Sequence, residues 1–193
     1  MPDGTPFPRV ASTALLTLPN VITFGRLCAV PLAVWLVLQQ MMSEAFFLFV
    51  AAGLSDAVDG WLARRGGGSV VGALLDPVAD KALLVSMYVT LAGVHVLPDW
   101  LAILVVFRDV VIVGGVLLLF VLGHPVPIHP LYVSKANTVL QIALVALALL
   151  HSFFSPGLPF LPDVLIMDVL VWAVAATTLV SGGAYVWNAV RGR

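Results

Sequence analysis

The sequence predicts an all-α integral membrane protein with six transmembrane helices, folded as a single domain over residues 1–193. Hydrophobic residues make up 61% of the chain and charged residues only 10%, and the mean hydropathy is +1.10. Soluble domains do not combine so much apolar sequence with so little charge. The apolar residues fall in long runs, which favours spanning helices over the short alternating segments of a β-barrel.

Each of the six expected spans is about 20 residues long, the length that crosses a bilayer as a helix. The spans are residues 21–40, 44–64, 73–95, 100–122, 133–152 and 164–188. Glycine and proline mark the connections, as in Gly66-Gly67-Gly68 after the second span and Leu97-Pro98-Asp99 after the third. Residues 1–18 are expected to form a short juxtamembrane segment, because they lack the charged start and compact apolar stretch of a cleaved signal peptide.

The basic residues predict the orientation of the spans, since Lys and Arg favour the cytoplasmic side. With six spans, one side of the membrane receives Arg9, Arg64, Arg65, Lys135, Arg191 and Arg193. The opposite loops, near 41–43, 96–99 and 153–163, contain no Lys or Arg. Both termini are therefore expected in the cytoplasm. The multi-pass protein is expected in a bacterial cell (inner) membrane, or in the mitochondrial inner membrane if the source is eukaryotic.

Two classes of site are excluded by composition. The single cysteine, Cys28, lies in an apolar run, so no disulfide framework and no thiolate metal site are expected. Only nine Lys and Arg are present, and they form no basic patch, so nucleic-acid binding has no support.

The most informative feature is four aspartates in this nearly uncharged chain. Asp56 and Asp59 are three residues apart, and Asp76 and Asp80 are four apart, so each pair shares one helix face. A carboxylate at the centre of a membrane helix costs about 2.5–3.5 kcal/mol on insertion scales. Asp56 and Asp80 each lie roughly 12 Å inside the cytoplasmic ends of adjacent antiparallel spans. Two facing stripes of oxygens at one depth suit Mg²⁺ or Mn²⁺, both hard ions.

A structural salt-bridge network is the alternative interpretation, because Arg64, Arg65 and Lys81 are near enough to pair with some of the acids. Four acids within 25 residues exceed what such a network needs, so a metal or substrate site is favoured. Small residues beside the acids leave room for a bulky ligand close to the backbone.

The run resembles the signature of the CDP-alcohol phosphatidyltransferases, integral membrane enzymes of phospholipid synthesis. All fixed positions of that signature are filled, by Asp56, Asp59, Gly60, Ala63, Arg64, Gly72, Asp76 and Asp80. The gap of seven residues between Arg64 and Gly72 is shorter than the family's usual eight or nine, so a tighter turn is expected. Leu18-Pro19-Asn20 with Arg26 is similar to the family's opening.

The resemblance implies that CDP-diacylglycerol is the donor and CMP the leaving group, with a homodimer as the assembly. It implies that Asp56, Asp59, Asp76 and Asp80 hold Mg²⁺ or Mn²⁺, as two ions, with Asp80 as a ligand to the second metal, the catalytic general base, or both. For the CDP moiety it implies a binding site of Asp56, Gly60, Ala63, Arg64, Ser69 and Gly72.

Two motifs are similar to the branch that makes cardiolipin from phosphatidylglycerol. They are Arg108-Asp109 and Ser134-Lys135-Ala136-Asn137-Thr138, followed by Gln141. The alternatives are a phosphatidylglycerophosphate synthase, which uses glycerol 3-phosphate, and more remotely a transporter with an acidic ion site.

Arg108 and Lys135 are the candidates for binding the acceptor's phosphate. Asp109 is able to neutralise Arg108 but points about 100° away around the helix, so pairing of Arg108 with an acid on another span is the other interpretation. Lys135 is also placed to snorkel at the interface. Asn137 and Gln141 line the same face or hydrogen-bond between helices.

Overall fold

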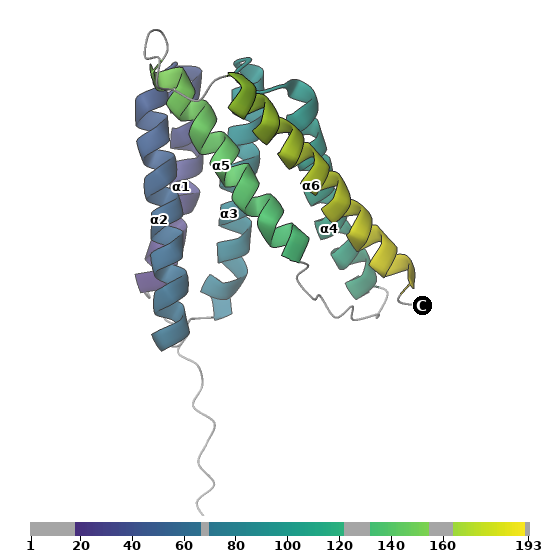
Figure 1. The fold of residues 1–193 in the computed structure, drawn as a ribbon. Helices are drawn as coiled ribbons and strands as arrows, with labels where there is room; N and C mark the ends of the chain where they lie inside the picture. Colours follow the sequence, from purple (N-terminus) through teal and green to yellow (C-terminus); the bar gives the residue numbers. More distant parts are fainter. Residues whose placement is uncertain (1–17, 67–69, 122–131, 155–163, 192–193) are drawn as a thin grey trace, which may run out of the picture.

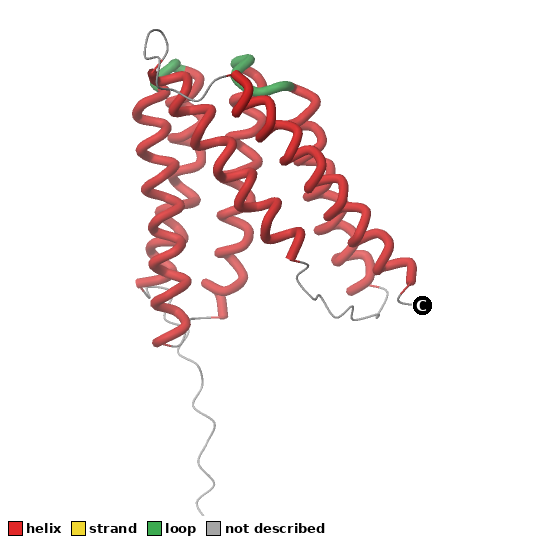
Figure 2. Tube along the Cα trace, in the orientation of Figure 1, coloured by secondary structure: helices red, strands yellow, loops and turns green. Residues whose placement is uncertain are grey.

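Six α-helices make up the secondary structure of the described residues, which are 18–66, 70–121, 132–154 and 164–191 (Figures 1 and 2). Their side chains are described at 25–55, 81–115, 133–154, 165–185 and 187. In this computed structural model the helices are α1 Leu18–Leu38, α2 Met42–Gly66, α3 Val70–Gly93, α4 Asp99–Val121, α5 Tyr132–Phe154 and α6 Val164–Arg191. The expected six-helix, all-α architecture is confirmed for this part of the chain.

Successive helices alternate in direction, so the start of α1 and the end of α6 lie at the same end of the bundle (Figure 1). The end of α2, the start of α3, the end of α4 and the start of α5 lie at that end too (Figure 1). We call it the basic end, because Arg64, Lys135 and Arg191 are in the helix turns nearest to it. The helices draw apart toward the basic end and converge toward the other (Figure 1).

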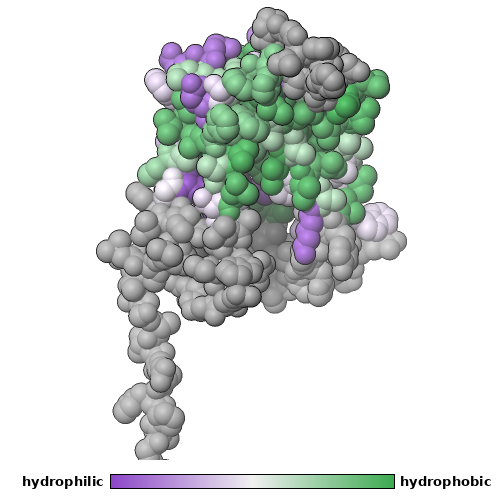
Figure 3. All heavy atoms as spheres, turned by 60° about the vertical axis from the view of Figure 1, so that its left-hand side comes forward, coloured by the Kyte–Doolittle hydropathy of each residue, from purple (hydrophilic) through white to green (hydrophobic). Residues whose placement is uncertain are grey.

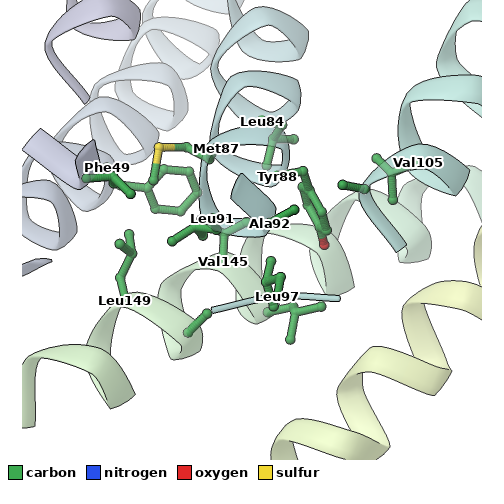
Figure 4. Close-up of a cluster of buried hydrophobic side chains, with 14 of the residues drawn as sticks. Phe49, Leu84, Met87, Tyr88, Leu91, Ala92, Leu97, Val105, Val145 and Leu149 are labelled. Carbon is green, nitrogen blue, oxygen red and sulfur yellow. The ribbon is translucent and has the colours of Figure 1, made fainter. Parts of the chain in front are cut away.

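The central helix is α3, which packs against α1, α4 and α5. Its fully buried Met87, Tyr88 and Leu91 meet Val145 and Leu149 of α5 in the apolar core (Figure 4). Of the helix pairs that pack together, α1 pairs with α2 and with α3, and α2 pairs with α5. Within the described residues α2 and α3 do not pack on each other.

The outer surface is apolar, as a lipid-facing surface requires. Large side chains stand exposed at helical spacing on α4, where Ile103 is 68% and Phe107 65% exposed, and on α6 at Leu165, Val169 and Trp172. Hydrophobic colour covers most of the described face in Figure 3. Apolar patches of this extent on a soluble monomer would promote association.

Five hydroxyl groups in the described helices are satisfied within their own helix. Ser55, Ser86, Thr90, Thr138 and Ser152 each donate to the carbonyl four residues earlier. In a medium without water this arrangement avoids the cost of an unpaired polar group. Within the described residues, Val133–Phe154 and Leu165–Tyr185 are long and apolar enough to cross a membrane, and Gly25–Leu38, Met42–Ser55 and Lys81–Gly93 are shorter apolar stretches.

Two helices end in a Schellman motif without glycine. After α1, Met41 N–H donates to Leu36 O and Gln40 N–H to Val37 O; after α3, Val96 and His95 donate to Leu91 and Ala92 in the same way. The residue that turns the chain, Gln40 or His95, has φ of 61°. Glycine adopts this conformation without the steric cost that a Cβ imposes.

We therefore expect Gln40→Gly to stabilise the protein by about 1 kcal/mol. Gln39→Gly is the matched control, because Gln39 is equally exposed but has a negative φ. It should destabilise by a similar amount, since glycine only adds flexibility there. Thermal midpoints in one detergent compare the two variants, and equal shifts would contradict the strain at Gln40.

Candidate functional site

The aspartate signature lies on two antiparallel helices that are joined at the basic end (Figure 1). Asp56 and Asp59 are in α2, and Asp76 and Asp80 are in α3. The backbone is helical through both pairs, so the spacing of three and of four residues keeps each pair on one helix face. The four side chains lie outside the described residues, and among the described side chains no group of three potential ligands could hold a metal ion.

Most of the other residues expected to bind the nucleotide also lie on α2 and α3. Gly60, Ala63 and Arg64 are in the last turns of α2, and Gly72 is in the first turn of α3. Ser69 falls in residues 67–69, outside the described part of the chain. The helical backbone keeps Asp56, Asp59, Gly60 and Ala63 in one stripe along α2, as the sequence predicts.

A cavity of about 360 Å³ lies next to these segments, between α1, α2, α3 and α5. Gly53 and Leu54 line it less than one turn before Asp56, and Leu83 and Leu84 line it about one turn after Asp80. The lining is mostly apolar, and its polar side chains are Arg26 and Thr138. The cavity occupies the space that is left because α2 and α3 each pack on α1 and not on each other.

A chain of ion pairs and hydrogen bonds crosses from α3 to α6 beside the signature. The Lys81 ammonium lies 2.9 Å from both carboxylate oxygens of Asp109. Arg108 donates from Nη1 to Asp109 Oδ1 at 2.7 Å, from Nη2 to Ser134 Oγ at 2.8 Å and from Nε to Ser181 Oγ at 3.0 Å. We call Lys81, Asp109, Arg108, Ser134 and Ser181 the charged cluster.

Arg108 thus pairs with its own neighbour in the chain. The expected divergence of about 100° between adjacent helix positions holds at Cβ, but the flexible arginine stem brings its guanidinium back to Asp109. The Arg108 side chain is only 5% exposed, which makes the guanidinium an interior group. Three of its five N–H donors are used, so two remain for another partner.

One turn deeper, α5 carries amide groups whose hydrogen bonds are incomplete. Asn137 Oδ1 lies 2.8 Å from Thr177 Oγ1 and 3.0 Å from Thr178 Oγ1, while its buried Nδ2 has no partner. Gln141 is fully buried, and neither atom of its amide has a partner. Tyr88 donates to the Gln141 backbone carbonyl at 3.3 Å.

The two acceptor candidates have different surroundings. Arg108 is buried in the charged cluster, whereas Lys135 is exposed and directly follows Ser134, a partner of Arg108. Arg108 thus bonds to the residue before Lys135, and through Asp109 it is linked to Lys81 of α3, the helix that carries Asp80. The sequence offered Lys81 as a partner for the signature acids, but its ammonium forms an ion pair with Asp109.

Three partners of the site were not predicted, namely Ser181, Thr177 and Thr178 of α6. Their spacing of three to four residues in an otherwise apolar helix, followed by Gly182-Gly183, is the signal that marks a polar contact face. Asp109 was predicted only as a neighbour of Arg108, and its link to Lys81 depends on the packing of α3 against α4.

The fold and the site define a membrane-type helical bundle with an acidic signature on two helices and a buried charged cluster beside it. The sequence profile of the CDP-alcohol phosphatidyltransferases matches residues 16–180. The chain belongs to this family of membrane-embedded proteins.

Three relatives illustrate the range of similar proteins. The cardiolipin synthase (CMP-forming)/mitochondrial hydrolase fusion protein of Schizosaccharomyces pombe is 34% identical, over 95% of this chain and 33% of its own length. The chloroplastic CDP-diacylglycerol–glycerol-3-phosphate 3-phosphatidyltransferase 1 of Oryza sativa is 36% identical, over 88% of this chain and 56% of its own. The corresponding Bacillus subtilis transferase is 29% identical, over 92% of this chain and 98% of its own.

Proposed function

We propose that this chain transfers a phosphatidyl group from CDP-diacylglycerol to an alcohol and releases CMP. The observation that carries the proposal is the family signature on two antiparallel helices, with one aspartate pair on the helical backbone of α2 and the other on that of α3. The chain spans 33% and 56% of the length of the first two relatives, and 98% of the Bacillus subtilis relative.

Asp56, Asp59, Asp76 and Asp80 are the proposed ligands of one or two Mg²⁺ or Mn²⁺ ions. Carboxylates alone, spaced on helix faces, form a hard oxygen donor set of the kind these ions prefer. When bound, the ions would neutralise the pyrophosphate and polarise the bond to be broken. Arg64 would add positive charge, and Gly60, Ala63, Ser69 and Gly72 would admit the nucleotide close to the backbone.

Asp80 is the proposed general base. In the transfer, the acceptor's hydroxyl oxygen forms a bond to the phosphorus that carries diacylglycerol, and the bond from that phosphorus to CMP breaks. The hydroxyl proton goes to the Asp80 carboxylate, which acts as the general base.

The apolar cavity suits a lipid chain of the donor. Its lining by Phe49, Leu54, Leu83 and Ile142 offers hydrocarbon surface directly beyond Asp56 and Asp80, on the side away from the basic end. A liponucleotide would therefore place its phosphates at the aspartates and an acyl chain in the cavity. Such burial contributes about 25 cal/mol for each Å² of apolar surface.

Arg108 and Lys135 are the proposed acceptor site, and phosphatidylglycerol is the proposed acceptor. In this proposal one phosphate group binds between Arg108 and Lys135. Arg108 offers its two free N–H donors, and Lys135 offers its exposed ammonium. The uncharged Asn137, with its unpartnered Nδ2 one turn from Ser134, suits the glycerol hydroxyls of that lipid. The product would be cardiolipin.

Glycerol 3-phosphate is the second candidate acceptor. It is favoured by the names of the Oryza sativa and Bacillus subtilis relatives, and this chain covers almost the whole length of the Bacillus subtilis protein. The same donor chemistry would then give phosphatidylglycerophosphate. We further propose that both termini are on the cytoplasmic side of a cell membrane, which the basic residues at the basic end support. The homodimer is proposed from the family resemblance alone.

The deciding experiment supplies the purified chain with CDP-diacylglycerol, Mg²⁺ and one acceptor at a time. CMP release with phosphatidylglycerol, at least about 10-fold faster than with glycerol 3-phosphate, is expected if the uncharged amides select the acceptor. Addition of EDTA should stop the release, and excess Mg²⁺ should restore it. Faster release with glycerol 3-phosphate would replace the first candidate by the second, and no release with either would refute the function.

A further inference from the structure

We propose that Asp109 is a positioning residue for phosphatidyl transfer, which holds the helix of the proposed base and the proposed acceptor arginine in one fixed arrangement. The proposal rests on the proposed function and assigns a role to a residue outside the aspartate signature. Asp109 does this through two ion pairs, which we call its two arms. The first arm is the ion pair with Lys81 on α3, and the second is the ion pair with Arg108 on α4.

The first arm fixes the rotation of α3. Lys81 directly follows Asp80, so the two residues are separated by a fixed angle of about 100° around the axis of α3. Both Asp109 oxygens contact the Lys81 ammonium at 2.9 Å, which ties the lysine to one position on α4. Rotation of α3 about its axis, which would also turn Asp80, therefore requires breaking this ion pair.

The second arm fixes the direction of the Arg108 guanidinium. Asp109, Ser134 and Ser181 each take a different nitrogen of Arg108, from three different helices. The planar guanidinium has donors in a fixed geometry, so three partners determine where the remaining two N–H groups point. Loss of Asp109 would leave only the two neutral hydroxyl partners.

Charge explains why a carboxylate is needed between the two arms. Arg108 is 5% exposed and Asp109 11%, so both are interior groups, and Lys81 is partly buried at 38%. Without Asp109 the buried Arg108 guanidinium and the partly buried Lys81 ammonium would have no described anion between them. With it, the three side chains keep one net positive charge, which favours an anionic acceptor beside Arg108.

The test compares four variants in the CMP-release assay, with kcat and the KM of donor and acceptor measured separately. Asp109→Asn keeps the shape and removes the charge, and it should lower kcat and raise the acceptor KM, together by about 10- to 100-fold. Its donor KM should stay within about twofold, since the proposed donor residues Gly60, Ala63 and Arg64 are on α2 and Asp109 is on α4. Lys81→Met removes only the first arm, so it should lower kcat with an unchanged acceptor KM.

The remaining two variants separate positioning from simple stabilisation. Asp109→Glu retains the charge and should recover most of the lost activity. The double variant Lys81→Met with Asp109→Asn should be no worse than Asp109→Asn, because both changes break the same arm. Asp99→Asn is the matched control, an exposed acid on the first turn of α4 at the opposite end, and should behave as the original protein.

Three results would overturn the positioning role: an unchanged acceptor KM in Asp109→Asn, multiplied losses in the double variant, or losses that vanish once rates are divided by the folded fraction. The folded fraction comes from size-exclusion profiles and thermal midpoints of the same samples. Failure of the proposed function is distinct, because the original protein itself would then release no CMP with any acceptor.

Discussion

Replacing Asp80 by asparagine should reduce CMP release by at least about 100-fold, and up to about 10⁴-fold, with the fold unchanged. Asparagine has nearly the same shape as aspartate, but it cannot accept the proton of the acceptor hydroxyl, and it is a weaker ligand for a hard cation. The loss should appear in kcat with saturating substrates. Steady-state release of CMP from CDP-diacylglycerol measures it.

Asp99→Asn serves again as the control for this variant, because it makes the same chemical change on an exposed residue at the other end of the bundle. It should leave kcat within about twofold, as expected of a surface acid. An Asp80→Asn variant that releases CMP as fast as the original protein would show that another group accepts the proton.

Enlarging the side chain at Gly182 should disable the proposed acceptor site without replacing any charged residue. A Cβ at this position would lie 3.4 Å from Arg108 Cγ, an ordinary contact distance, so alanine fits. The further carbons of leucine would enter the space of the arginine stem, and the guanidinium would have to leave Asp109, Ser134 and Ser181. We expect Gly182→Leu to lower kcat/KM for the acceptor by about 100-fold, as misplacement of a binding group by about 1 Å does.

Gly183 provides a matched control one residue away. Nothing lies within 4 Å of a Cβ built there, so Gly183→Leu should retain activity and differ from Gly182→Leu although the composition is the same. Gly182→Ala should also retain activity. Equal kcat/KM in the two leucine variants would show that the direction of Arg108 does not matter for the acceptor.

The charged cluster and the amides of α5 give this bundle an unusual interior for a lipid environment. Polar side chains in such surroundings are costly unless paired, and they mark substrate pathways when they occur. Here Lys81, Asp109 and Arg108 satisfy one another across α3 and α4. Asn137 and Gln141 retain unused hydrogen-bonding groups, which makes them the natural places to examine after the acceptor has been identified.

Helix number and helix ends were predictable because span length and turn residues are local properties of the chain. Every expected end lies within three residues of the observed one. The largest differences are three residues, at the start of α1 and of α3 and at the end of α6, where the helix continues beyond the expected span through Asn20, Gly72 and Arg191 among others. Apolar length predicts the part in lipid, and it does not predict how far the backbone hydrogen bonds continue.

The sequence alone determined the helical class, the pairing of the aspartates by spacing and the side that gathers the basic residues, since all three depend on periodicity and charge order along the chain. Only the tertiary structure decided that α1 packs between the partners α2 and α3, that Asp109 holds both Lys81 and Arg108, and that Ser181 reaches Arg108. These contacts depend on the rotation of each helix about its axis and on the reach of flexible side chains. Packing against neighbouring helices sets that rotation.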